Sequence, residues 1–463
     1  MIDFSHKNTR NIAISLYKRM TENNYKYQTL TLFTGFGKTA ISVATAGLFA
    51  VRFKQDINVF IIAPRTKLDD GSWEYTINEY NKIAKYKLNI LDKATPQGLD
   101  VANKNDKLLK RDIKAMPEKK RNKLKFLKEW KEATNETPTV FLIDEVQMFK
   151  NPTTNRSKAL KKLMANGIGL GITATPMSNG LLEDGVSYLV FNDFYKSKNQ
   201  FEKEHIPRGM FDEYYKPDVY TKDHEIDPNR FIDLPLFEDR IKQTVYAPKV
   251  EVDFEMPNTQ AHTVTYDLAP QTIHDMKKIH LDYKQRRYDS YMGYLSDLRR
   301  AIGSDLSHAR QLAKIILANP GRQPLIFYNT NAELEAIQYA LEQIHVDYKT
   351  INGHPDSDKV QDIDHSFKNQ AIIIQYKAGG AGIEFKNSSM TIFYGLQYSW
   401  QDTEQAMGRN VRRGMSNDLT VDHLFLVATN PHDAKVFEAL ERKESFTEKL
   451  LTGIAEEIMQ ESL

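Results

Sequence analysis

A loop of small residues, Thr34-Gly35-Phe36-Gly37-Lys38-Thr39, could bind the phosphates of a nucleotide. It follows an apolar run and precedes a segment of helical character, so backbone amides at a helix N-terminus would face the bound anion. Lys38 could neutralise β and γ oxygens, and the Thr39 hydroxyl could ligand magnesium. Because Leu32 stands where the full motif has another glycine, a glycine-rich turn without a ligand is the structural alternative.

An acidic pair, Asp144-Glu145, comes directly after the apolar run Val140-Phe141-Leu142-Ile143. Carboxylates at the end of a buried strand are costly unless a cation compensates them. Asp144 could therefore hold magnesium, directly or through water, and Glu145 could polarise an attacking water. The alternative is an acidic cap between a strand and a loop.

A threonine-containing turn, Gly171 to Pro176, follows another strand-like stretch. Its hydroxyls could relay between the acidic pair and partner groups, although a structural Thr/Pro loop would look the same.

Basic residues recur near the C-terminus, where Arg409 and Arg412 would share one face if their segment is helical. Two guanidinium groups could then reach a γ-phosphate and stabilise the charge that develops during phosphoryl transfer. A basic surface helix is the alternative.

Short apolar runs that alternate with helical segments must position these groups, and that alternation predicts parallel α/β layers. The runs fall into two similar sets, which predict two tandem lobes with parallel sheets. The expected strands are 29–33, 58–63, 139–143 and 169–173 in the first set, and 324–328, 371–375, 390–394 and 423–427 in the second.

The length of 463 residues exceeds what one hydrophobic core usually supports. We predict a first lobe over 1–192, a second lobe over 319–463, and between them a linker with helical elaboration over 193–318. A basic helical insertion at about 100–135 could contact phosphates, or it could be a solvated hairpin.

Composition excludes several classes of protein. Hydrophobic residues make up 41% and charged residues 27%, which is the balance of a globular chain rather than a disordered one. The net charge of +2 does not by itself indicate a nucleic-acid binder, and the absence of cysteine excludes disulfides and thiolate metal sites. Without an apolar stretch of membrane-spanning length, we expect no membrane partner and a cytoplasmic protein.

Taken in order, the motifs resemble those of a superfamily 2 helicase-type ATPase, most closely the Snf2-like branch. The Lys150-Asn151 pair and the glycine loop 378–382 are similar to Snf2 elements. Gln147 departs from the family, where many relatives have histidine, and the region from Phe4 to Asn11 offers His6 and Asn8 but no glutamine to read adenine. The matching segments are TGFGKT at 34–39, IIAPRTKL at 61–68, DEVQ at 144–147, TATP at 173–176, IFYNT at 326–330, AGGAGIEF at 378–385 and QAMGRNVRRG at 405–414.

The resemblance implies two RecA-like lobes with helical insertions, which close on ATP and magnesium and step along a nucleic-acid strand. It assigns roles in hydrolysis to Lys38, Asp144, Glu145, Gln405, Arg409 and Arg412; ATP binding to Thr34, Gly35, Phe36, Gly37, Lys38, Thr39 and Gly382; magnesium to Thr39 and Asp144; and strand binding to Pro64, Arg65, Thr66, Asn329 and Thr330.

We therefore expect an ATP-dependent DNA helicase or translocase, with replication proteins among its partners. Its compact length favours a setting in a bacterial cytoplasm or a phage-infected cell. A translocase that moves on duplex DNA without separating strands, an RNA substrate and a scaffold that binds nucleic acid without turnover remain alternatives.

Overall fold

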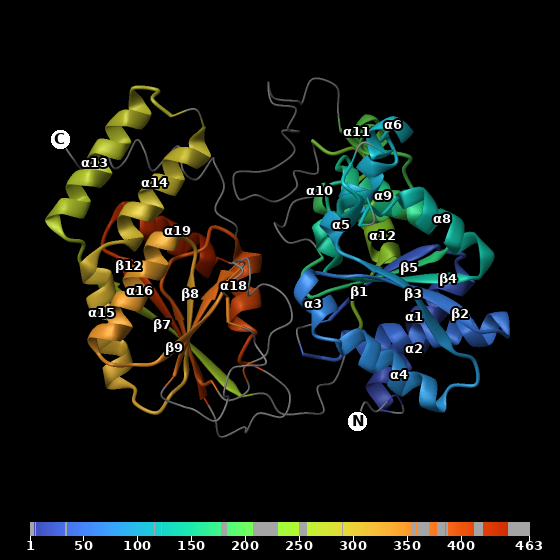
Figure 1. Ribbon diagram of the computed structural model, residues 1–463, viewed down its shortest axis with the longest axis horizontal. Helices are drawn as coiled ribbons and strands as arrows, with labels where there is room; N and C mark the ends of the chain where they lie inside the picture. The colour runs from blue at the N-terminus through green and yellow to red at the C-terminus, as the bar shows by residue number, and fades with distance from the viewer. Residues whose placement is uncertain are drawn as a thin grey trace. The chain divides into compact units, whose positions relative to one another are not determined.

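The chain folds into two compact units, Met1–Glu251 and Val252–Leu463, each built on its own sheet (Figure 1). None of the helices that the structure describes is long and apolar enough to cross a bilayer. This computed structural model describes residues 4, 6–32, 35–114, 116–121, 123–176, 183–206, 230–249, 257–288, 290–352, 357–358, 370–376, 385, 388–411 and 420–442.

The first unit contains a six-stranded sheet in the order β3-β2-β4-β5-β1-β6, in which every described pairing is parallel. Its inner strands are buried over nearly their whole length because helices cover both faces. The strands are β1 (Tyr27–Thr31), β2 (Ile57–Ile62), β3 (Leu88–Ala94), β4 (Thr139–Asp144), β5 (Ile168–Thr173) and β6 (Val245–Tyr246).

Helices alternate with these strands, and their apolar faces complete the core around Phe60, Phe141 and Leu160. Ser, Thr or Asp side chains cap the N-termini of several of them and so satisfy their first amides. The helices are α1 (Lys7–Glu22), α2 (Lys38–Phe53), α3 (Arg65–Asp69), α4 (Ser72–Ile83), α5 (Pro96–Asn105), α6 (Lys110–Lys114), α7 (Glu118–Arg121), α8 (Leu127–Glu136), α9 (Asn155–Leu163), α10 (Glu183–Phe191), α11 (Lys198–His205) and α12 (Leu234–Thr244).

The second unit repeats the plan with a sheet in the order β7-β12-β11-β8-β10-β9, again with parallel pairings throughout the described part. Ile326, Ile373 and Ile392 lie in its inner strands and are inaccessible to solvent. The strands are β7 (Asn258–Tyr266), β8 (Pro324–Tyr328), β9 (Tyr348–Ile351), β10 (Ala371–Gln375), β11 (Met390–Phe393) and β12 (Thr420–Ala428).

Helices α13 and α14 of this unit pack against each other, and Figure 1 shows them at one end of it, in yellow. The other helices flank the sheet. The helices described here are α13 (Pro270–Lys284), α14 (Tyr291–Gly303), α15 (Leu306–Ala318), α16 (Asn331–Gln343), α18 (Trp400–Met407) and α19 (Pro431–Glu441).

The predicted fold class, two tandem parallel-sheet lobes, is confirmed. All eight strands expected from the sequence exist, with ends shifted by at most a few residues, and they are the four inner strands of each sheet. The four strands that the sequence did not reveal, β3, β6, β7 and β9, are the four edges. An edge strand has less of its surface covered, so its sequence lacks the continuous apolar run.

The region 193–318, which the sequence separated as a linker, divides between the two units. Phe201 and Phe237 of α11 and α12 are buried in a cluster of the first unit, and β6 extends its sheet. Leu298 and Leu312 of α14 and α15 belong to the core of the second unit. Apolar faces on these helices account for the difference, because each must be buried against a sheet or another helix.

Candidate nucleotide and nucleic-acid sites

The phosphate loop lies at the carboxyl end of β1, where Gly35 and Gly37 have φ values of 86° and 89°. Residues with a side chain rarely adopt this conformation, so both glycines are required by the path of the loop. Lys38 is the first residue of α2, and its Nζ donates to the Leu32 carbonyl at 2.9 Å. The loop thus ends at a helix N-terminus whose amides suit an anion.

The other predicted loop residues have different surroundings. Phe36 is buried and anchors the loop, and Thr39 is half-buried in the first turn of α2. Thr34 lies outside the described residues.

Asp144 is the last residue of β4, and its carboxylate is buried. Burial, together with the neighbouring Glu145 carboxylate, raises the pKa of Asp144 to about 7, although Lys67 and Lys38 act to lower it. The backbone amide of Glu145 donates to Asp144 Oδ1 at 3.0 Å. A buried carboxylate whose ionisation is so disfavoured gains most from a bound cation.

Glu145 has a φ of 50°, a left-handed conformation that is uncommon for residues other than glycine, asparagine and aspartate. The Gln147 amide donates to Glu145 Oε2 at 2.5 Å and so fixes the direction of this carboxylate. Gln147 is itself buried. Strained backbone of this kind often marks a functional site, which supports the role predicted for Glu145.

The order of the strands brings these groups to one edge of the first sheet. β5 lies between β1 and β4, and the Leu32 amide at the end of β1 donates to the Thr173 carbonyl at 3.3 Å. The Thr173 hydroxyl accepts from the Thr175 amide at 3.0 Å, which shapes the threonine-containing turn. The loops that carry Lys38 and Asp144 are therefore separated by a single strand, as the carboxyl edge of a parallel sheet requires.

Pro64, Arg65 and Thr66 also lie at this edge, directly after β2. Pro64 is the N-cap of α3, a five-residue helix without a buried residue, and the Arg65 side chain is 78% exposed. Its Nε pairs with Asp69 at 2.9 Å on the surface. An exposed guanidinium of this kind is accessible to a phosphate backbone.

The predicted strand-binding turn of the second unit, Asn329-Thr330, is built differently. Both backbone amides donate to Oε2 of the buried Glu333, at 2.5 and 3.3 Å. Glu333 belongs to a capping box with Thr330 at the start of α16. A Cβ on Gly395 would lie 2.5 Å from Glu333 Oε2, and one on Gly303 would meet its Cγ, so both glycines make room for this side chain.

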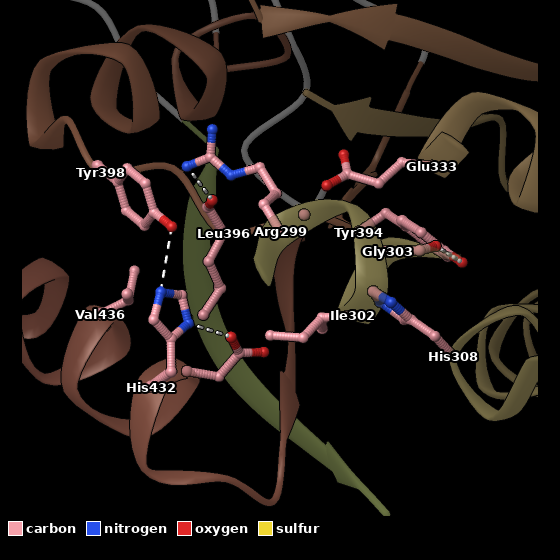
Figure 2. Close-up of a pocket in the computed structure, with 12 residues that line it drawn as sticks. Arg299, Ile302, Gly303, His308, Glu333, Tyr394, Leu396, Tyr398, His432 and Val436 are labelled. Atoms are coloured by element: carbon pink, nitrogen blue, oxygen red, sulfur yellow. Dashed lines mark hydrogen bonds and ion pairs between the residues drawn. The ribbon is translucent and has the colours of Figure 1, made fainter. Parts of the chain in front are cut away.

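A small pocket of about 20 Å³, large enough for one water, lies beside Glu333 (Figure 2). Arg299 from α14 donates to the Leu396 carbonyl at 3.4 Å and lies 3.9 Å over the ring of Tyr398. Asn329 Nδ2 donates to the same carbonyl at 3.3 Å. These contacts join the strand-binding turn to the loop that precedes α18.

Burial raises the pKa of Glu333 to about 7, although the Asn329 amide and the Arg299 guanidinium act to lower it. The Tyr398 hydroxyl bonds His432 Nε2 at 3.1 Å on the opposite side of the pocket in Figure 2.

The predicted basic helix near the C-terminus is shorter than expected. α18 ends at Met407 with Gly408 as its C-cap, so Arg409 lies in the following turn and the shared helical face is wrong for this residue. The Arg409 carbonyl accepts from the Phe385 amide at 2.9 Å, which holds the chain away from helical geometry. Gln405 is half-buried on α18, Arg409 is buried, and Arg412 and Gly382 lie outside the described residues.

Three contributors were not identified from the sequence. Lys67 influences Asp144 because β2 and β4 are adjacent strands, a fact that spacing along the chain does not reveal. The support that Gln147 gives to Glu145 depends on a 3-10 turn. Glu333 did carry a signal, since Thr330 and Glu333 have the spacing of a capping box.

Two family models match the chain in order. The model described as the type III restriction enzyme, res subunit, matches residues 5–178, and the helicase conserved C-terminal domain matches residues 307–414. Every residue predicted to act in the site lies within these ranges.

Similar proteins include Protein CHROMATIN REMODELING 19 from Arabidopsis thaliana, 25% identical over 172 residues, which are 36% of this chain and 22% of that protein. The chain thus matches about a fifth of that relative's length. Among solved structures, the Sulfolobus solfataricus SWI2/SNF2 ATPase core in complex with dsDNA is 16% identical, with a TM-score of 0.35 over 93% of this chain and 90% of that one. The C-terminal part of the Fun30 ATPase domain is 15% identical, with a TM-score of 0.36 over 44% and 97%.

The matched models assign an N-terminal and a C-terminal helicase-type half to the two parallel-sheet units, and the relative is a chromatin remodelling protein. The two matched models together therefore identify the chain as a superfamily 2 helicase-type ATPase, whose motifs are similar to those of the Snf2-like branch.

Proposed function

We propose that this chain hydrolyses magnesium-ATP when nucleic acid is bound and uses the energy to move along DNA. The observation that carries the proposal is the edge of the first sheet, where the phosphate loop with Lys38 and the acidic pair Asp144-Glu145 are one strand apart. Phosphoryl transfer needs little more than such positioned charges and an oriented water.

Lys38 would bind the β and γ phosphate oxygens of ATP, and the backbone amides of the loop would bind the other phosphate oxygens. Glu145, held by Gln147, would orient the attacking water and accept its proton. Gln405, Arg409 and Arg412 would act on the γ-phosphate, a role that rests on the family resemblance.

The residues present suit magnesium. Mg²⁺ prefers oxygen ligands and is commonly held by one or two carboxylates together with substrate phosphates. Asp144 offers a buried carboxylate with a raised pKa, and Thr39 offers a hydroxyl at the start of α2. When bound there, the ion would neutralise charge on the phosphates.

DNA is the track that we propose. The Arabidopsis relative is named for chromatin remodelling, which supports DNA over RNA. Arg65, Thr66 and the Asn329-Thr330 turn would contact the phosphate backbone, which positions a strand without reading its sequence. A role in bacterial or phage replication or repair, with replication proteins as partners, remains part of this proposal.

The test is steady-state ATPase activity titrated with single-stranded DNA, duplex DNA, forked DNA and RNA. We expect stimulation by DNA, with a strong dependence on salt. Equal stimulation by RNA would contradict the assignment of DNA as the substrate. If no nucleic acid stimulated the ATPase activity, the proposal that the chain is a nucleic-acid motor would be wrong.

Strand displacement and triplex displacement assays then separate a helicase from a duplex translocase. Release of the triplex strand without unwinding would leave translocation as the activity.

A further inference from the structure

The strongest local concentration of charge lies in residues 104–131, which we call the basic segment. It contains twelve Lys and Arg against four Asp and Glu, a formal charge of about +8. Because the whole chain carries only +2, all remaining residues together are acidic in balance. The net positive charge of this one segment therefore exceeds the net charge of the entire protein.

The cations of the basic segment whose side chains the structure describes are exposed to solvent. Three of them form ion pairs: Lys104 with Asp100 at 3.0 Å, Arg111 with Asp112 at 3.3 Å, and Lys125 with Asp92 at 3.2 Å. No ion pair involves the other seven within the part of the chain that the structure describes. The ten basic side chains whose burial is described are all exposed: Lys104, Lys107, Arg111, Lys119, Lys120, Arg121, Lys123, Lys125, Lys128 and Lys131.

The base of the segment is fixed, although its middle is on the surface. Leu99 of α5 and Leu127 of α8 are buried in the core of the unit. Asn105 Nδ2 donates to the Lys125 carbonyl at 2.9 Å and so closes the two ends of the segment. The indole of Trp130 donates to Asp92 Oδ2 at 2.7 Å, beside the Lys125 ion pair. A closed base holds α7, with Lys119, Lys120 and Arg121, between two fixed ends instead of on a free loop.

The segment also starts near the predicted strand-binding residues. Ala94 at the end of β3 pairs with Ile62 at the end of β2, so Pro64 and the start of α5 leave neighbouring strands at the same edge. The ten residues of α5 span about 15 Å, since an α-helix rises about 1.5 Å per residue. One nucleic-acid molecule of a few nucleotides could contact both places.

We propose that the basic segment is an accessory surface that binds the phosphate backbone of DNA beyond the turn at Pro64-Arg65-Thr66. This inference rests on the proposed function. Exposed cations that form no ion pair in the described structure can bind phosphates through charge alone, so the surface contributes affinity and salt dependence without sequence preference. Its removal changes how tightly DNA binds and leaves the chemistry of hydrolysis intact.

The test compares two matched triple variants. One replaces Lys119, Lys120 and Arg121 by Gln; the control replaces Lys18, Arg52 and Lys85 by Gln, which removes the same charges from other exposed positions of the first unit. Binding of a labelled DNA oligonucleotide is measured by fluorescence anisotropy at several salt concentrations, and ATPase activity is measured with and without DNA.

We expect the basic-segment variant to bind DNA about tenfold more weakly or worse, with the slope of log affinity against log salt reduced by about 2 to 3. Its ATPase rate without DNA and its rate at saturating DNA should match wild type. The control variant should keep the wild-type affinity and slope.

Equal affinity and slope in the two variants would overturn the inference. So would unchanged DNA binding by the basic-segment variant together with loss of its binding to a labelled polyglutamate peptide, measured by the same anisotropy assay, because the surface would then serve an acidic protein partner. If wild type binds DNA through the basic segment but DNA does not stimulate its ATPase activity, the proposed motor function is wrong and the DNA-binding surface is still supported. The failure of one proposal can therefore be distinguished from the failure of the other.

Discussion

The two turns proposed to hold the nucleic-acid backbone have opposite constructions. In the first unit, Arg65 is on a five-residue helix without buried residues, and its described ion pair with Asp69 is exposed. In the second unit, the amides of Asn329 and Thr330 donate to a carboxylate inaccessible to solvent. Exposed ion pairs contribute about 0 to 1 kcal/mol, whereas breaking a buried polar network costs several times more.

Because of these constructions, the two turns would respond differently to a bound strand. The turn of the second unit is fixed in advance by Glu333, Arg299 and Leu396, so it can select a backbone geometry. The exposed Arg65 side chain can change rotamer at little cost and would adapt to the strand that we propose the other turn holds.

Removal of Glu333 should have the largest effect. Glu333→Ala would leave the amides of Asn329 and Thr330 without their acceptor and open a cavity against Gly303 and Gly395. We expect a loss of about 3 kcal/mol of unfolding free energy and faster hydrogen exchange at residues 329–330. Glu335→Ala, an exposed change on the same helix, is the control. Equal stability in the two variants would show that the turn is not held by this carboxylate.

The raised pKa of Glu333 predicts a pH dependence of the second unit. Its folded pKa of about 7 lies above the ordinary value of 4.5, so between these values the folded state binds the proton more tightly than the unfolded state. Its contribution to stability is therefore complete below about pH 4.5 and declines as the pH rises through 7, by about 3 kcal/mol in total. Urea unfolding of wild type and Glu333→Gln at pH 5 and pH 8 measures this. Parallel pH profiles for the two proteins would contradict the raised pKa.

Loss of Arg65 should have the smallest effect on stability. Arg65→Ala removes one exposed ion pair, so the unfolding free energy should change by no more than about 0.5 kcal/mol. DNA affinity should fall, and the salt slope should decrease by about 1 if the guanidinium contacts one phosphate. If Arg65→Ala leaves both the DNA affinity and the salt slope unchanged, Arg65 does not contact the strand.

Buried strands could be predicted from the sequence, and exposed strands could not. Val140 to Ile143 forms an inner strand and reads as a continuous apolar run, so it was recognised. The edge strand Asn258–Tyr266 is largely exposed and polar, and its sequence does not separate it from a loop. Strands buried on both faces have continuous apolar sequences, which can be recognised along the chain, whereas edge strands lack this pattern.

The candidate site could be predicted where its residues lie in motifs at the carboxyl end of a strand, as Lys38, Asp144 and Glu145 do. It could not be predicted where the contact depends on sheet order, as between Lys67 and Asp144. Arg409 was expected on a helix, but Gly408 ends that helix one residue earlier. The i, i+3 spacing of Arg409 and Arg412 suited a helix, but it could not reveal that the Arg409 carbonyl accepts a hydrogen bond from the Phe385 amide.

The most direct test of the central claim is phosphate release by wild type and Glu145→Gln with saturating DNA, measured beside ATP binding. We expect that both proteins bind ATP, that wild type hydrolyses it, and that the variant is slower by about 100-fold or more, since an oriented general base contributes at least that factor. Hydrolysis by Glu145→Gln at the wild-type rate would contradict the assignment of the acidic pair at the end of β4 as the site of the reaction.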